Sequence, residues 1–367
     1  MLRNRIIHQN ELVYVGPALE SGQTYSSPIT SNLDKLQSVS YDFGYQKTEV
    51  SIVGKSRVID RPVSSSPVVN LSLEYCLSSF HNENIMGLKV TPASSNSKFA
   101  LLSGLADEED RTKDKRNLYL ATTKEGVDLI GGESGDIEGV LCFHECQINS
   151  YGLNFSLGDI AKANMSVEGI NASYFSSGAN LDVDTIDRQS ATRSSGVAVS
   201  IPMSGDFRLI SKTDIFTPRN ISIEFYNSDG SSLTDTGFAP IANDKVQSFS
   251  MDFSIPRKGI NLPDHKVVYD KLLNTPIMGS ASMDFIEHGS GSGSLIDMID
   301  TNKNYKVIAR IKNDSSQEFM NFTMNDVKID NINHSHSLGS NKDSSVSLSF
   351  PIDPFDENKS VNFSGTY

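Results

Sequence analysis

Apolar and polar residues alternate with a period of two in several short segments, and two of these segments are nearly the same. DKLQSVSYDF (34–43) and DKVQSFSMDF (244–253) share seven of ten residues, and the three that differ are apolar in both. A period of two is the pattern of a β-strand with one buried face. The pattern therefore predicts a strand in each place, with the same face directed inward.

Three further pairs of segments match in the same order along the chain. Residues 10–16 match 220–227, residues 58–75 match 267–285, and residues 145–168 match 326–349. Collinear matches indicate a tandem duplication. We expect one domain at 8–170, a polar linker at 171–217 with a strand at 197–201, and a second domain at 218–360.

The matched segments lie further apart in the first copy than in the second. Positions 34 and 145 of the first copy correspond to positions 244 and 326 of the second. The first copy must therefore carry an insertion between them, which we place at about 86–115. This stretch ends in SNSKFALLSGLADEEDRTKDKR, whose last ten residues are mostly charged. We expect a long exposed loop there.

The alternation assigns a direction to each side chain of the matched strands, because a slip of one residue would expose the apolar set. The side chains expected to face the core are Val39, Tyr41, Phe43, Leu71, Leu73, Tyr75, Phe249, Met251, Phe253, Met283 and Phe285. The opposite face is rich in Ser, Asn and acidic residues, and lysine is nearly absent from it, with Lys328 the exception. Such a face is either an ordinary solvated sheet face or the lining of a water-filled, anion-repelling channel.

Turn and helix signals are few. Gly158 and Gly339 follow a leucine between two predicted strands in each copy, and we expect each to be the positive-φ residue of a β-hairpin turn. SLIDMIDT (294–301) has apolar residues at helical spacing and predicts a short helix.

Composition and charge narrow the function classes. The 367 residues carry a net charge of −13, which argues against ordinary binding to a phosphate backbone. No apolar run is long enough for a membrane span, and the first residues lack the pattern of a secretory signal. Three cysteines give no disulfide framework and favour a reducing compartment during folding.

Candidate chemistry is sparse, and we expect no enzyme activity and no cofactor. CFHEC (142–146) holds two cysteines and a histidine but has no second ligand cluster in reach, so buried thiols beside a strand bulge are favoured over a metal site. GSGSG (289–293) lacks the residues that follow a phosphate-binding loop. No grouping of Ser, His and Asp has the context of a catalytic site.

The strand SVSYDF, the long loop after it, the segment DRPVSSSPVVNLSLEY and the hairpin around Leu157, Gly158 and Asp159 together resemble the tail-tube (major tail) proteins of tailed bacteriophages. The resemblance covers most of the first copy and is weaker in the second. It implies two tandem β-sandwich or split-barrel domains, each with a short flanking helix and each giving four strands to an oligomeric inner β-barrel.

The resemblance also implies an assembly and a place for it. Six domains close one ring, so a duplicated chain would form a trimer, and rings would stack into a tube in the virion tail through which DNA is ejected. Other partners would be tape-measure, terminator and baseplate or tip proteins, with synthesis in the host cytoplasm and no membrane contact. DNA would pass without specific binding, because acidic residues would face the lumen: Asp42, Glu74, Glu145, Glu168, Asp252, Asp284, Asp326 and Asp330.

Two alternatives from other classes remain open. The first is a β-rich phage adhesin or capsid decoration protein with two Ig-like domains, which should expose aromatic side chains for contacts. The second is a hydrolase on a β-scaffold, which would need a convergent acid pair in one domain. The presence of acidic residues at matching positions of both copies disfavours a hydrolase.

Overall fold

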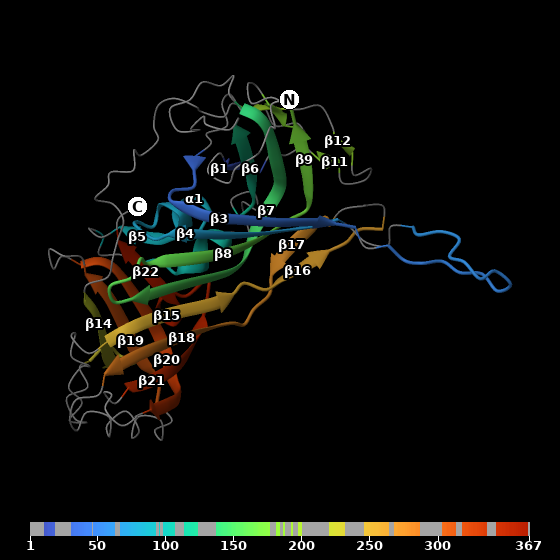
Figure 1. Cartoon of the computed structure of the whole chain (residues 1–367). Coiled ribbons are helices and arrows are strands. Elements are labelled where there is room, and N and C mark those ends of the chain that lie inside the picture. The colour runs from blue at the N-terminus through green and yellow to red at the C-terminus, as the bar shows by residue number, and fades with distance from the viewer. Residues whose placement is uncertain are drawn as a thin grey trace.

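A computed structural model describes residues 11–18, 31–45, 47–62, 67–92, 95, 98–106, 114–123, 137–176, 181–183, 186–187, 192–193, 197–199, 220–231, 246–263, 268–286, 303–312, 318–335 and 343–365. Strands make up most of these residues, which confirms the mainly β class (Figure 1). The expected helix at 294–301, the GSGSG segment and Gly339 lie outside the described residues. We call 11–176 the first half and 220–365 the second half.

The described part of the first half holds nine strands and two short helical elements. The strands are β1 (Glu11–Pro17), β2 (Ser31–Asn32), β3 (Leu36–Gly44), β4 (Val68–Cys76), β5 (Val90–Pro92), β6 (Arg116–Thr123), β7 (Ile137–Ser156), β8 (Lys162–Gly169) and β9 (Asn171–Phe175). The helical elements are α1 (His81–Ile85) and the 3-10 turn η2 (Leu101–Leu105).

The described part of the second half holds nine strands as well. They are β14 (Asn220–Asn227), β15 (Val246–Ser254), β16 (Arg257–Ile260), β17 (Asp270–Leu273), β18 (Ile277–Ile286), β19 (Tyr305–Lys312), β20 (Glu318–Ser335), β21 (Asp343–Ile352) and β22 (Val361–Gly365), with the 3-10 turn η5 (Glu357–Lys359). Between the halves, β10 (Leu181–Val183) pairs with β13 (Val197–Val199), and β11 (Ile186–Asp187) pairs with β12 (Thr192–Arg193). The strand expected at 197–201 is therefore present over 197–199.

Strands pair in the same order in the two halves. In the first, β1 pairs with β6, β6 with β7, β7 with β8, β8 with β4, and β4 with β3. In the second, β14 pairs with β19, β19 with β20, β20 with β21, β21 with β18, and β18 with β15. Every one of these pairs is antiparallel.

One further pair joins the halves. β15 lies antiparallel to the C-terminal part of β7, from Ser248 opposite Ser156 to Ser254 opposite Ser150. The result is one sheet of eight strands in the order β20, β21, β18, β15, β7, β8, β4, β3, which we call the central sheet (Figure 1). Each half gives it four strands.

The long strands β7 and β20 each serve two sheets, because each bends near its middle. Glu145 and Asp326 have positive φ angles of 46° and 54°, and each is the first residue of the matched segments 145–168 and 326–349. A residue in this left-handed region breaks the ladder and redirects the strand. Before the bend β7 pairs with β6 and β9, and after it with β8 and β15.

A single hydrophobic core runs through both halves. Phe80 stacks on Phe363 with ring centroids 5.4 Å apart, and Phe322 lies edge-on to Phe363 at 4.9 Å. Phe155 of the first half packs against Phe249 and Phe322 of the second. β5 also pairs in parallel with β22, so the two halves share core and sheet.

Two sequence expectations need correction. The stretch we expected to be an exposed loop is folded in its described first part, because Leu101, Leu102 and Leu105 give η2 an apolar side that is buried. The linker we placed from residue 171 begins instead with β9, which pairs with β7, and β22 lies beyond the expected limit at 360. Both strands have only five residues, which is too short for their alternation to mark them.

Candidate assembly surfaces

The polar face of the central sheet is continuous across the seam between the halves. Next to that seam, between β15 and β18 of the second half, Ser248 Oγ donates a hydrogen bond to Asp284 at 2.6 Å, and the hydroxyls of Ser250 and Ser282 lie 2.8 Å apart. Short polar side chains pair with each other in this way because opposite residues in neighbouring strands point to the same side. The face is therefore a layer of hydroxyl, amide and carboxylate groups.

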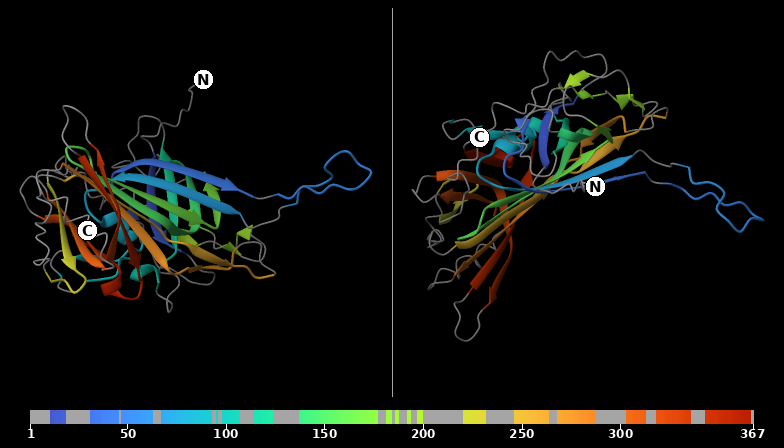
Figure 2. Two further views of the ribbon diagram at one scale, coloured as in Figure 1. Left: turned by 90° about the horizontal axis from the view of Figure 1, so that it is seen from below. Right: turned by 45° about the horizontal axis from the view of Figure 1, so that its top comes forward.

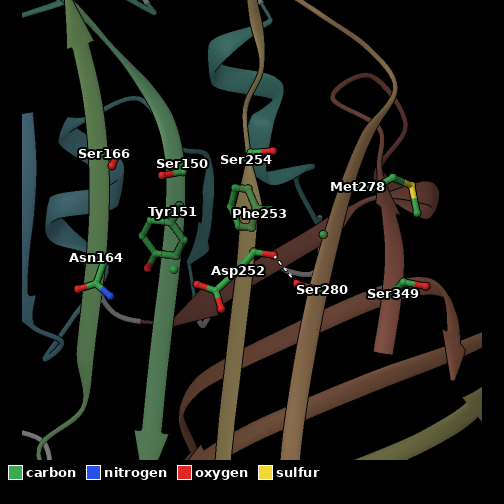
Figure 3. A pocket seen from close by; sticks show the side chains of 12 residues that line it. Ser150, Tyr151, Asn164, Ser166, Asp252, Phe253, Ser254, Met278, Ser280 and Ser349 are labelled. Atoms are coloured by element: carbon green, nitrogen blue, oxygen red, sulfur yellow. Dashed lines mark hydrogen bonds between the residues drawn. The ribbon is translucent and has the colours of Figure 1, made fainter. Parts of the chain in front are cut away.

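A shallow pocket of about 580 Å³ lies on this face over the seam, between β8, β7, β15, β18 and β21 (Figure 3). Asp252 projects over Gly152, the residue opposite it on β7, where any larger side chain would meet its carboxylate. Burial raises the pKa of Asp252 above its ordinary value. The other polar residues of the lining are Ser150, Asn164, Ser166, Ser254, Ser280 and Ser349.

Six of the eight predicted acidic residues lie on strands of this face: Asp42, Glu74, Glu168, Asp252, Asp284 and Asp330. Glu145 and Asp326 lie elsewhere, at the bends of β7 and β20, where the side chain of Glu145 is 14% exposed and pairs with Lys115. The bend changes which face the following side chains point to, so a strict period of two assigned these two residues to the wrong place.

Lysine is rarer than acid on the polar face but not limited to Lys328. Lys162 on β8 lies beside Glu74, with 2.8 Å between Nζ and Oε1. Of the six acidic residues of the face, only Glu74 and Glu168 form a salt bridge with another described residue, and Asp284 and Asp330 instead accept hydrogen bonds from Ser248 and Ser349.

Both outer edges of the central sheet lack a strand partner in the described part of the chain. β3 pairs only with β4, and the end of β20 after Asp330 pairs only with β21. Tyr41 and Phe43 on β3 are 52% and 42% exposed, so within one chain they do not occupy the core positions expected for them. Their counterparts on β15, Met251 and Phe253, are 0% and 4% exposed because β7 lies beside that strand.

The other residues predicted to face the core do so. Leu71, Leu73, Tyr75, Phe249, Met283 and Phe285 are buried, whereas Val39 is partly buried. Gly158 has a φ of 80° in the turn between β7 and β8, as expected of a hairpin glycine.

A hairpin projects from each half where the first strand of the central sheet ends. Residues 47–62, which we call the arm, extend away from the body of the molecule (Figure 2). The hairpin of β16 and β17 instead lies against the first half, held by three ion pairs. These are Arg257 with Asp114 at 2.9 Å, Lys115 with Asp270 at 3.0 Å, and Lys271 with Glu168 at 2.6 Å.

These ion pairs are enclosed. The side chains of Arg257, Lys115 and Asp270 are each at most 9% exposed. Burial opposes the ionisation of Glu168, but hydrogen bonds from Lys271 and Asn149 outweigh it and hold the pKa below its ordinary value. No sequence pattern indicates this network, because Asp114 and Lys115 stand in a charged run that resembles an exposed loop.

The CFHEC segment is buried in β7. Cys142 and Cys146 are enclosed thiols on either side of the bend at Glu145, which confirms the expectation of buried thiols beside a bulge. Burial raises the pKa of Cys146 to about 12. His144 Nε2 lies 2.5 Å from Ser173 Oγ on β9. The described residues contain no group of three potential metal ligands, and none of their helices is long and apolar enough to cross a membrane.

Comparisons with known proteins give no match by sequence and weak matches by structure. No protein-family model and no curated protein matches the chain. A chain of the anti-feeding prophage (AFP) baseplate aligns with a TM-score of 0.29 and 12% identity, over 40% of this chain and 92% of that chain. The SPP1 tail tube aligns with a TM-score of 0.28 and 8% identity, over 47% and 80%. Hcp1 from E. coli EAEC 042 aligns with a TM-score of 0.21 and 14% identity, over 40% and 99%. Likeness at this level does not assign a function.

Proposed function

We propose that this chain is the major tail-tube subunit of a tailed virus and that three copies close a ring through the edges of their central sheets. The observation that carries the proposal is the seam between the halves. There the first strand of one four-stranded unit, β15, pairs with the long strand of the other, β7. β3 is the counterpart of β15, and β20 is the counterpart of β7. They form the two outer edges of the central sheet, and neither has a partner strand there among the described residues.

The seam predicts the register of the contact between copies. Asp252 lies opposite Gly152, and Phe253 lies opposite Tyr151. Each of these residues has a counterpart in the other half of the chain. Exchanging the four residues for their counterparts places Asp42 opposite Asn333 of the neighbouring chain, and Phe43 opposite its Ile332. Such pairing would satisfy the open backbone groups of both edges and cover Tyr41 and Phe43.

The contact is heterologous, since β3 of one copy meets β20 of the next. Heterologous contacts close into rings when the rotation allows it. The number three follows from the resemblance to tail-tube proteins, in which six domains form a ring, and from our proposal that the two halves are duplicated domains. The shared pairing order and the matching bends support the duplication.

In a closed ring the polar face would line the lumen, because the apolar face packs on the core. A lining of serine, asparagine and carboxylate groups repels DNA, and it has few basic side chains that could bind the phosphates. Rings would then stack into the tube, with tape-measure, terminator and baseplate or tip proteins as its other partners in the virion.

A disulfide between copies tests the register. Asp42→Cys with Asn333→Cys should give a covalent trimer on a non-reducing gel, because directly opposed strand residues have the spacing that a disulfide needs. The three native cysteines are buried and serve as an internal control. Negative-stain images of the same sample should show rings or tubes with an axial pore.

Persistent monomers at high concentration, with no cross-link, would overturn the proposal and favour a monomeric adhesin or decoration protein. The control pair Asp42→Cys with Asp353→Cys should not cross-link in either case, since Asp353 follows β21 and lies off the edge of β20.

A further inference from the structure

The arm and the β16–β17 hairpin are built alike. Val50 pairs with Asp60 in the arm, and their counterparts in the second half, Ile260 and Asp270, pair in the same way. The next hydrogen bond also matches: Ile59 N–H donates to the Val50 carbonyl, and Tyr269 N–H donates to the Ile260 carbonyl, both at 2.9 Å. The same hairpin therefore follows the first strand of the central sheet in both halves.

The two hairpins also carry the same charges at the same positions. Lys47 corresponds to Arg257, Asp60 to Asp270, and Arg61 to Lys271. In the second half these three side chains make the buried ion pairs with Asp114, Lys115 and Glu168. A set of charges used for docking in one hairpin is thus present in the other.

The arm has no such seat among the described residues of its own chain. Arg61 pairs across the hairpin with Glu49, at 2.7 Å, and both side chains are more than half exposed. Apolar residues on it are exposed too: Val50 is 40% exposed, Ile52 56% and Ile59 40%. An ion pair this exposed contributes little stability, and the apolar side chains gain nothing from solvent.

We infer that the arm docks on the second half of the neighbouring copy, in the place where the β16–β17 hairpin docks on the first half. The inference rests on the proposed ring, because it requires β3 of one chain to lie beside β20 of the next. The occupant is a second copy of this chain, since the intramolecular docking supplies the geometry for the intermolecular one.

The seat on the second half has polar groups for two of the three ion pairs, whereas Lys303, which matches Asp114, would lie near Lys47 of the arm. In the first half Asn149 donates to Glu168 at 2.8 Å, and this carboxylate receives Lys271. In the second half Asp330 takes the place of Asn149, and Ser349 takes the place of Glu168. Ser349 donates to Asp330 at 2.9 Å, so the carboxylate is on the long strand β20 and not on its neighbour β21. Asp330 is exposed, and Arg61 of a neighbour is the side chain that corresponds to Lys271.

The second ion pair also has a counterpart. Lys115 lies 3.4 Å from Glu145 at the bend of β7, and Asn304 donates to Asp326 at 3.4 Å at the bend of β20. Asp60 of the arm would therefore meet Asn304, with exposed Lys303 next to it in the chain. These contacts give one seat per copy, between Asp330 and the bend at Asp326.

Paired cysteines test the docking. Arg61→Cys with Asp330→Cys should form an intermolecular disulfide in assembled protein, giving a covalent trimer on a non-reducing gel. Lys55→Cys with Asp330→Cys is the matched control, because Lys55 is an exposed residue of the same arm near its tip and has no place in the seat. The control pair should stay uncross-linked.

Charge exchange tests the same contact without cysteines. Arg61→Glu and Asp330→Arg should each raise the protein concentration needed for half-maximal assembly by roughly tenfold, and the two changes together should restore it. A like change at the tip, Lys55→Glu, should leave ring formation unaltered.

The outcomes separate the docking from the ring. A cross-link between positions 42 and 333 without one between 61 and 330, together with no effect of charge exchange, would overturn the docking and leave the ring intact. Loss of both cross-links would overturn the proposed function itself. Equal cross-linking of the control and the test pair would show a mobile arm and also overturn the docking.

Discussion

Glu83 is a fully buried carboxyl group beneath the central sheet, on α1. It accepts hydrogen bonds from the hydroxyls of Tyr75 at 2.6 Å and Tyr151 at 2.8 Å, both through Oε1. Oε2 has no hydrogen-bond partner among the described residues. Burial raises the pKa of Glu83 to about 7, against the opposing effect of the two tyrosine hydrogen bonds. A protonated carboxyl is the form that suits this site.

The raised pKa predicts a pH-dependent stability. The folded chain holds a proton that the unfolded chain releases above its ordinary pKa of 4.5, so the free energy of unfolding should fall as the pH rises from there to about 7 and level off above. Glu83→Gln should remove this decrease in the free energy of unfolding, which amounts to about 3 kcal/mol over the whole range. Urea denaturation of the unassembled chain at pH 5 and pH 8 measures it.

The control for this prediction is Glu49→Gln, on the exposed arm, which should leave the slope as it is. An equal slope in the Glu83→Gln variant and the unmodified chain would contradict the assignment.

At the scale of elements, the same strand has different surroundings in the two halves. β3 and β15 come from nearly identical sequences and pair with β4 and β18 in the same way, including a bulge at Gln37 and at Gln247. β15 has β7 on its other side, and β3 has no described strand there. Edge strands with exposed aromatic residues are suited to pairing with another chain.

Matched substitutions at this strand should therefore have different effects. Met251→Ser should destabilise the folded chain by about 3 kcal/mol, because it leaves a cavity and a hydroxyl in the core. Tyr41→Ser should destabilise the single chain much less, because Tyr41 is about half exposed and keeps only part of its ring against Phe143, and it should weaken assembly. Thermal unfolding and sedimentation velocity report the two effects. A large loss of single-chain stability in Tyr41→Ser would contradict an assembly role for this edge.

At the scale of the whole molecule, the two halves act as one body. They share the central sheet, the aromatic cluster around Phe322 and the ion pairs of the β16–β17 hairpin. Buried charges of this kind are costly to leave unpaired, so they fix the position of one half on the other more than they add stability.

Removal of one buried cation tests this connection. Lys115→Met leaves the carboxylates of Asp270 and Glu145 enclosed without it and should destabilise the chain by about 3 kcal/mol. Lys162→Met, which breaks the exposed pair with Glu74, should change little. Urea denaturation compares the two, and equal effects would argue against a structural role for the buried network.

The proposed lumen makes a prediction of its own. Asp252→Lys with Asp284→Lys would turn the lining at the seam from repelling DNA to attracting it, so assembled tubes should retain DNA at low salt and release it at high salt. Glu11→Lys with Glu138→Lys makes the same charge change on β1 and on β7 before its bend, as a control. Equal retention by both variants would place the polar face outside the channel.

The alternation of the sequence determined what is local: the positions of the main strands, the side of each that is apolar, the glycine turn at 158 and the order of the matching segments. It failed at the bends of Glu145 and Asp326, where the alternation breaks, and in β9 and β22, which are too short to be recognised by it. α1 and Glu83 carry no pattern that marks them as buried, because their burial depends on Tyr75 and Tyr151 from distant strands.

Tertiary structure alone decided what lies beside each element. DKLQSVSYDF and DKVQSFSMDF specify one strand each with the same faces, and the hairpins that follow them carry the same charges. Only the fold places β7 beside the second strand and leaves the first as an open edge, with its arm extended and its aromatic side chains about half exposed. Alternation is set by neighbours in the chain, whereas an edge is set by which strand lies next to it in space.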